Sequence, residues 1–157
     1  MSAPESPPSR AVPVRLSRLH TWQLSNATHC GHRLVAEALA SAGLRMAHYQ
    51  AMAALAELAP PTQQELGRII GVDAGNLVPV LNDLEQQHYA VRTRDPHNRR
   101  RNIVQLTATG RRALADLDGL VAQANDTLLT PLSSAERDRL HELLSRITAD
   151  TPNRCQE

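Results

Sequence analysis

Large aromatic side chains and lysine are almost absent from this sequence. Its 157 residues include no phenylalanine, no lysine, one tryptophan and two tyrosines. With so few aromatic residues, a core must be built from leucine, alanine and valine, which suits closely packed helices better than a sandwich of sheets. The sequence also lacks an apolar run as long as a membrane span, so no membrane partner is expected.

Cysteine is scarce as well. Cys30 and Cys155 are too few for a disulfide scaffold and lack the spacing of a zinc site, which favours a reducing compartment. Residues 1–13 are rich in proline and serine without an apolar core, so we expect a disordered arm and no signal peptide. Residues 151–157 are expected to form a flexible tail. The expected location of the protein is therefore the cytoplasm.

Apolar residues recur at helical spacing over residues 14–42 and again over residues 46–58. The first pattern ends at Gly43, a suitable C-terminal cap, and the second ends before the prolines at 60 and 61. A helix of the first length carries more apolar surface than a small domain can cover. We therefore expect part of it to pack against a second chain, the alternative being a long core helix.

Two short helices are predicted next. Thr62 and Glu65 have the spacing of a capping box, which starts a helix that Gly71 ends. A second helix is predicted over residues 73–88, where leucines and valines share one face. Two short helices joined by a tight turn that contains glycine are typical of a helix-turn-helix.

A basic β-hairpin is predicted after this pair. Apolar and polar residues alternate on both sides of the turn sequence DPHN, and arginines crowd its tip. A helix is then predicted from Thr107 to about Leu128, and Ser133 with Glu136 forms a capping box that opens a last helix. The predicted fold is mainly α with a small β-hairpin: a winged helix-turn-helix domain flanked by N- and C-terminal helices.

The positive charge of the chain is local. The net charge is only +1, but residues 92–112 hold seven arginines against one acid, Asp95. This concentration favours a surface that binds a polyanion over a solvated charge run or a localisation signal. In a winged helix, the second short helix can enter the major groove of DNA while the hairpin places arginines on phosphates or in the minor groove. The alternative is an interaction module in which the arginines bind an acidic protein.

The motifs LGRIIGVDAGNLVPVLNDLE, RTRDPHNRRRNIVQLT and TGRRAL resemble the MarR family of winged-helix transcriptional regulators. The most specific part is the pattern D-P-x-x-R-R-R-x-x-x-x-L-T-x-x-G across Asp95–Gly110. The resemblance implies a homodimer, held by a long N-terminal helix in residues 14–45 and by C-terminal helices in 107–150. Residues 46–106 would form the lobe that binds a pseudo-palindromic operator in double-stranded DNA. Such regulators usually repress, and a small aromatic or carboxylate effector releases them.

The resemblance assigns DNA contacts to three segments. The N-terminal half of the recognition helix would face the bases, with Asn76 as the expected base reader and a cap or turn role as its alternative. The start of the preceding helix would meet phosphates, or else be merely solvated. The wing would contact the backbone and the minor groove. The predicted DNA-binding residues are Gln63, Gln64, Asp73, Gly75, Asn76, Val78, Arg92, Arg94, Arg99, Arg100 and Arg101.

Two residues of the DNA-binding lobe are expected to act structurally. The resemblance implies that Asp95 forms a salt bridge with Arg99 or Arg101 inside the wing. Pro79 departs from the family pattern, because a polar or basic residue usually stands there. Proline inside a helix costs about 3 kcal/mol, so we expect the recognition helix to start late, near Asn76, or to bend at Pro79.

An effector pocket is expected between the long first helix and the DNA-binding lobe. Arginine and histidine side chains there would suit a carboxylate or phenolate, although each is also plausible as a surface or dimer-interface residue. The predicted effector-binding residues are Arg15, Arg18, His20, Trp22, His32 and His48.

Metal and redox sensing remain alternatives for a regulator of this fold. His29 and His32 are spaced to reach one metal ion, with His48 or a residue of a partner chain completing the set, and Cys30 is the residue that would sense oxidants. No metal site or cofactor is predicted. Neither a glycine-rich phosphate loop nor a nucleophilic serine motif is present in the sequence, so an enzyme is not expected.

Overall fold

The computed structural model describes residues 13–95, 98 and 101–150. The arm predicted over residues 1–13, except for Pro13, and the tail predicted over 151–157 lie outside this part of the chain. The described elements are α1 (Val14–Ser17), α2 (His20–Ser41), α3 (Met46–Glu57), α4 (Gln63–Ile70), α5 (Ala74–Gln86), β1 (Ala90–Arg94), β2 (Asn102–Leu106), α6 (Ala108–Leu128) and α7 (Ser134–Asp150). The predicted mainly α fold with one hairpin is confirmed.

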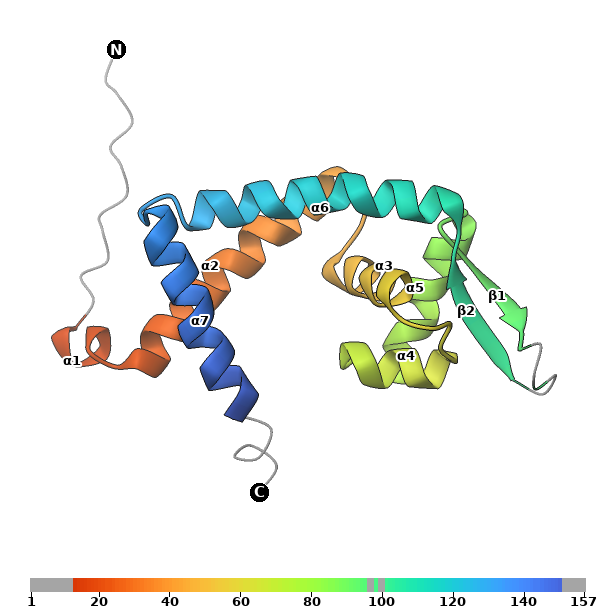
Figure 1. The fold of residues 1–157 in the computed structure, drawn as a ribbon, viewed down its shortest axis with the longest axis horizontal. Helices are drawn as coiled ribbons and strands as arrows, with labels where there is room; N and C mark the ends of the chain where they lie inside the picture. The colour runs from red at the N-terminus through yellow and green to blue at the C-terminus, as the bar shows by residue number, and fades with distance from the viewer. Residues whose placement is uncertain (1–12, 96–97, 99–100, 151–157) are drawn as a thin grey trace, which may run out of the picture.

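Helix α6 connects the two ends of the molecule (Figure 1). Helix α2 packs along α6, while α3, α4, α5 and the hairpin gather at one end and α1 and α7 lie at the other. The helix-turn-helix and the wing therefore form a compact lobe, which α2 and α6 join to the terminal helices.

The predicted first helix is broken in two. Helix α1 ends at Ser17, and α2 starts at His20 after an extended Leu19. In a continuous helix the Ser17 carbonyl would accept a backbone hydrogen bond. Here it accepts from the side-chain amide of Gln23 over 2.8 Å instead. The end of α2 is as predicted, because Gly43 adopts a positive φ of 72° that glycine tolerates without strain.

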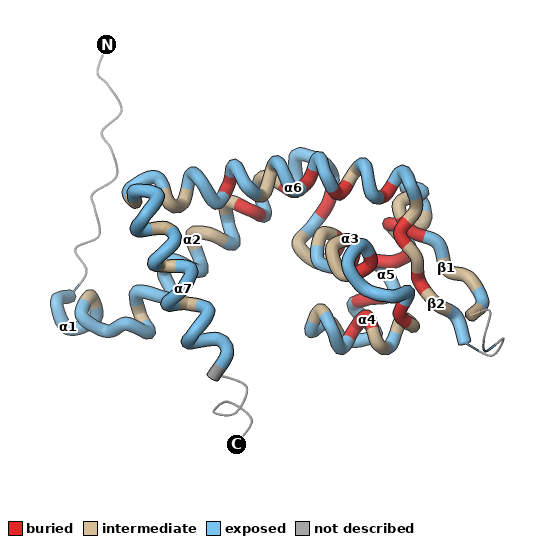
Figure 2. The backbone as a smooth tube through the Cα atoms, viewed as in Figure 1, coloured by how far each residue is buried: buried red, intermediate tan, exposed pale blue. Residues whose placement is uncertain are grey.

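The core lies in the lobe of the helix-turn-helix and wing and beneath α6, as the red segments of Figure 2 show. It consists of leucine, valine, alanine and one methionine, so the predicted aromatic-free core is confirmed. Its largest fully buried side chains are Leu39, Met52, Leu66, Leu77, Leu81, Leu84 and Val104. Among the described residues, no helix is long and apolar enough to cross a membrane.

The terminal helices bury little of their apolar surface. Helix α1 contributes no buried residue, and residues 134–149 of α7 contribute none either. Apolar side chains remain exposed on these elements and on the start of α2, namely Val14, Leu16, Leu19, Leu24, Leu143 and Ile147. Exposed apolar surface of this extent on neighbouring elements marks an interaction surface.

The hairpin is fixed to the lobe at its base. Strands β1 and β2 pair antiparallel, with Ala90 opposite Leu106 and Arg94 opposite Asn102. The amide of Val104 donates to the Pro61 carbonyl over 2.9 Å, which ties β2 to the segment before α4. At the base of the hairpin, β1 follows α5 after residues 87–89, and Thr107 connects β2 to α6. Backbone hydrogen bonds therefore contribute to the orientation of the wing.

Helix α5 matches the helix predicted over residues 73–88. It begins at Ala74, with Asp73 as its N-terminal cap, and it continues through Pro79. Of the two alternatives for Pro79, the late start near Asn76 is wrong, and the bend stays a prediction. Pro79 has no amide hydrogen to donate to the carbonyl of Gly75, but both residues are exposed, so water can bond that carbonyl instead.

Candidate nucleic-acid interface

The start of α4 is built around a capping box. The Thr62 hydroxyl accepts from the Glu65 amide over 3.3 Å, and the Glu65 carboxylate accepts from both the amide and the hydroxyl of Thr62 over 2.7 Å. The predicted box is confirmed. The hydrogen bond from the Thr62 amide, followed by the one from its hydroxyl, lowers the pKa of Glu65. Gln63, half-buried, and Gln64, exposed, flank this start, and their phosphate contacts stay a prediction.

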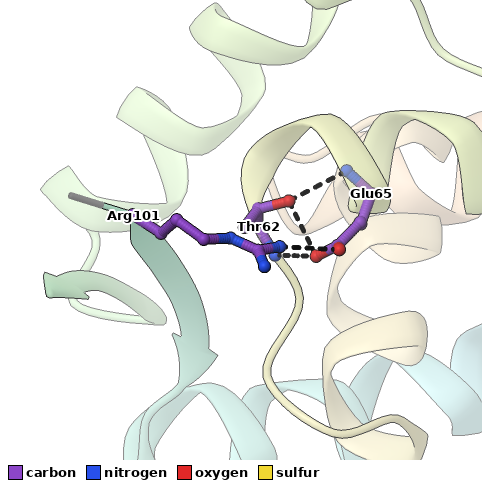
Figure 3. Close-up of polar contacts among 3 residues, drawn as sticks. All are labelled: Thr62, Glu65 and Arg101. Atoms are coloured by element: carbon purple, nitrogen blue, oxygen red, sulfur yellow. Dashed lines mark hydrogen bonds and ion pairs between the residues drawn. The ribbon is translucent and has the colours of Figure 1, made fainter. Parts of the chain in front are cut away.

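The second carboxylate oxygen of Glu65 holds the wing (Figure 3). Arg101, just before β2, places Nη2 at 2.8 Å from Glu65 Oε1. One carboxylate thus joins the cap of α4 to the base of the hairpin tip. Sequence reasoning missed this link, because the capping box explained Glu65 without showing that one of its oxygens remained available.

The salt bridge between Asp95 and Arg99 or Arg101 stays a prediction. Arg101 pairs with Glu65, and Arg99 lies outside the described residues, as does Arg100. The backbone of Asp95 does organise the wing, because its amide donates to the Arg101 carbonyl and its carbonyl accepts from the Asn98 amide. A structural role for Asp95 in the turn is consistent with these bonds.

Arg92 lies in a different environment from the one predicted. Its amide donates to Glu85 Oε1 over 2.8 Å, and its Nη1 donates to Glu85 Oε2 over 2.7 Å and to Asn82 Oδ1 over 2.9 Å. Only 25% of the Arg92 side chain is exposed. The guanidinium of Arg92 joins β1 to α5, and its DNA contact stays a prediction.

Other arginines of this region remain exposed. Arg94 at the end of β1 is exposed, and so are Arg111 and Arg112 in the first turns of α6. Exposed guanidinium groups can reach phosphate without first breaking an internal ion pair. Sequence reasoning counted Arg111 and Arg112 in the basic cluster but did not include them among the contact residues.

The first turn of α5 is held together internally. The Asp73 carboxylate accepts from the Asn76 amide over 3.0 Å and from the Asn76 side chain over 2.5 Å. The bond from the Asn76 backbone is the first cause of the lowered pKa of Asp73. Asn76 thus takes part in the cap, as its alternative interpretation predicted. Gly75 and Val78 are exposed on the same helix, and base contacts by these residues stay predictions.

His48 is a structural residue. Its side chain is 3% exposed; Nδ1 accepts from the Arg45 amide over 3.1 Å, and Nε2 lies 3.1 Å from Asp83 Oδ2. Because Nδ1 is an acceptor, the proton belongs on Nε2, which donates to Asp83. His48 therefore joins the start of α3 to α5, and its place in an effector pocket stays a prediction.

The other predicted effector residues belong to α1, to the C-cap of α1 and to α2, whereas His48 lies in α3. Arg15, Arg18, His20 and His32 are exposed and Trp22 is half-buried. A hollow of about 320 Å³ lies beside α5, lined among others by Arg45, Val72 and Asn76, and it includes none of the six predicted effector residues.

The structure limits the metal-sensing alternative. Across residues 13–95, 98 and 101–150, no three histidine, cysteine, aspartate or glutamate side chains are grouped to hold a metal ion. His29 and His32 are exposed on α2, but His48 is committed to Asp83 and cannot complete their set. Cys30 is a half-buried free thiol beside them.

Comparison with known proteins relates this geometry to a family. A model described as MarR family matches residues 42–101, the segment from just after α2 to just before β2. A curated relative from Thauera aromatica, provisionally named as a transcriptional regulatory protein for the hcr operon, is 33% identical over 99 residues. This alignment covers 61% of the present chain and 60% of the relative, so the chain spans about three fifths of the relative's length.

Solved structures extend the likeness beyond the lobe. The transcriptional repressor CouR bound to a 23-mer DNA duplex is 30% identical, with a TM-score of 0.78 over 89% of this chain and 99% of that chain. CouR from Rhodococcus jostii RHA1 bound to p-coumaroyl-CoA is 26% identical, with a TM-score of 0.70 over 88% of this chain and 95% of that chain. The similarity therefore includes the terminal helices as well as the helix-turn-helix and wing.

Proposed function

Because the chain belongs to the MarR family of transcriptional regulators, we propose that it is a non-enzymatic repressor that binds a pseudo-palindromic DNA operator as a homodimer. A small aromatic or carboxylate effector releases it from that operator. The observation that carries the proposal is the position of the basic wing beside a capped helix-turn-helix. The similarity to CouR in complex with DNA supports the same conclusion.

The wing and the helix starts supply two kinds of DNA contact. Exposed Arg94, Arg111 and Arg112 provide fixed positive charge next to the hairpin, and phosphates attract it irrespective of sequence. The start of α4 adds backbone amides that point toward an anion. Because Glu65 binds Arg101, the wing and the start of α4 keep a constant spacing, which suits them to neighbouring phosphates.

A salt titration with a defined competitor tests DNA binding. The purified chain is used to select duplexes from a library with a randomised segment, and the selected duplex is compared with the unselected library. We expect selective binding, with an affinity that falls steeply from about 50 to 200 mM salt as counterions are released. If no duplex is enriched and the basic surface instead binds an acidic polypeptide, the protein-interaction alternative replaces this proposal.

The homodimer is supported by the terminal helices. In a single copy of the chain, apolar side chains of α1, α2 and α7 are exposed. One of them, Ile147, is 54% exposed. A second copy covering these elements would remove that surface from water, at roughly 25 cal/mol per Å² of apolar area. Light scattering should give twice the mass of one chain. Ile147→Glu should shift the mass toward that of a monomer, whereas Arg146→Glu on the neighbouring exposed position should not.

The effector proposal combines the residues of α1 and α2 with one relative. CouR binds p-coumaroyl-CoA, a phenolic thioester that carries phosphates. In the present chain Arg15, Arg18 and His20 lie next to half-buried Trp22, so cationic and aromatic groups adjoin the proposed dimer surface. Adding p-coumaroyl-CoA or p-coumaric acid to the protein–duplex complex should release DNA, and Arg15→Ala combined with Arg18→Ala should weaken the release. Unchanged DNA binding with both compounds would contradict this class of effector.

A further inference from the structure

The outward face of the recognition helix α5 carries no charge in its first two turns. The buried side chains Leu77, Val80 and Leu81 fix the inner face of the helix. Apart from Asn76, the exposed residues of the first two turns are Ala74, Gly75, Val78 and Pro79. None of these side chains can donate or accept a hydrogen bond, so a bidentate contact to guanine or adenine is not available from them.

The polar side chains next to this face are engaged within the protein. The Asn76 amide donates to the Asp73 carboxylate over 2.5 Å, and the Asn82 carbonyl oxygen accepts from Arg92 over 2.9 Å. These bonds orient both amides toward the cap of α5 and the attachment of β1, while the Asn76 carbonyl oxygen and the Asn82 amide hydrogens take no part in them. The first two turns of α5 therefore present a mostly apolar surface, with Asn76 at its edge.

We infer that α5 recognises thymine through the C5-methyl group, with Val78 and Pro79 as the contacting residues. This inference rests on the proposed function. In the major groove the thymine methyl is the one apolar group that distinguishes a base pair, and small or branched apolar side chains are suited to contact it. Val78 is 39% exposed, so its methyl groups are available. Gly75 adds no side chain, which lets the backbone of α5 approach the bases closely.

The expected size of the effect follows from one methyl group. Removing a methyl from water contributes about 0.8 kcal/mol, which corresponds to about a fourfold change in affinity. Replacing thymine by deoxyuridine removes the C5-methyl and leaves the hydrogen-bonding edge unchanged. A dimer that contacts one such methyl with each chain would therefore bind the fully substituted duplex about sixteenfold more weakly.

The experiment uses the full chain and a duplex selected from a randomised library. The selected duplex is resynthesised with deoxyuridine in place of thymine, first within the half-sites and then only in the flanks. For the wild-type protein, half-site substitution should weaken binding about fourfold for each contacted methyl, and flank substitution should have no effect. Equal affinities for the thymine and deoxyuridine half-sites would overturn the inference.

Val78→Ala separates methyl recognition from the stiffness of the DNA. The substitution lies on an exposed face, so the variant should fold, and circular dichroism would check this. The ratio of its affinities for thymine and deoxyuridine half-sites should be smaller than that of the wild type, since the two γ-methyl groups of Val78 are missing while Pro79 remains. If Val78→Ala keeps the wild-type ratio, Val78 is not the reader. If the library yields no enriched duplex for the wild type, the proposed function fails, and this inference fails with it.

Discussion

Arg92 and Arg94 are neighbours on β1 for which we expect opposite behaviour. The sequence predicts a DNA contact for both. In the structure, Arg92 is bonded to Glu85 and Asn82, whereas Arg94 is exposed. We predict that Arg94→Gln changes the salt dependence of DNA binding but not stability, and that Arg92→Gln changes stability but not the salt dependence.

The magnitudes follow from the two environments. Arg92→Gln loses one hydrogen-bonded ion pair to Glu85 and one hydrogen bond to Asn82, both made by a side chain that is 25% exposed. The substitution also removes Nε and Nη2, which are buried and have no hydrogen-bond partner in the part of the chain that the structure describes. The lost bonds and the relieved desolvation partly cancel, leaving a destabilisation of about 1 to 2 kcal/mol. Arg94→Gln on the surface should change stability by less than about 0.5 kcal/mol.

The assay combines urea unfolding with binding to a mixed-sequence duplex at several salt concentrations. Each phosphate that a chain neutralises contributes about 0.9 to the slope of log K against log salt concentration, so a dimer of the Arg94 variant should show a slope about 1.8 shallower. The Arg92 variant should keep the wild-type slope. A shallower slope for Arg92→Gln at unchanged stability would refute the reasoning, since it would mean that Arg92 binds phosphate.

Three further predictions concern stability, each measured by urea unfolding. A β-carbon at Gly110 would lie 2.1 Å from the Tyr89 carbonyl oxygen, so Gly110→Ala should destabilise the chain by about 3 kcal/mol or more. A β-carbon at Gly119 would have no atom within 4 Å, so Gly119→Ala should stabilise the chain by up to about 1 kcal/mol. The pKa of Asp73 is lowered in the folded chain, so its carboxylate stabilises the fold at a pH above its ordinary pKa of 3.8. This stabilisation is lost as the pH falls through the folded pKa. Asp73→Asn should therefore make the free energy of unfolding depend less on pH in the acid range. His48→Ala should cost about 2 to 4 kcal/mol, and a cost below 0.5 kcal/mol would contradict its structural role.

The features that the sequence predicted well are local ones. Thr62 and Glu65 are three residues apart, so their reciprocal capping depends only on the helix they start. The hairpin likewise follows from a turn signal between two alternating segments, and Gly43 ends α2 through its own positive φ. In each case the deciding interaction lies within a few residues, where spacing alone determines which groups can meet.

The features that were missed depend on tertiary contacts. Arg92 belongs to an arginine-rich run, and no pattern in that run shows that Glu85 lies beside it once β1 folds back on α5. His48 has the composition of an effector ligand, but the approach of Asp83 on another helix makes it a buried link. The break between α1 and α2 after Ser17 contains no glycine or proline that would predict it. The apolar period of residues 14–42 also continues across the break, so the pattern predicts one helix.

The distribution of charge separates the source of affinity from the source of sequence preference. The exposed arginines of this region lie on the hairpin and at the start of α6, and they meet phosphates that every duplex offers equally. The outward face of α5 has no cation that would release a counterion on reaching a base. Specific and non-specific complexes should therefore neutralise the same number of phosphates. It follows that salt weakens both complexes in parallel, and that the ratio of their affinities is set by the uncharged contacts of α5 and by the shape of the DNA.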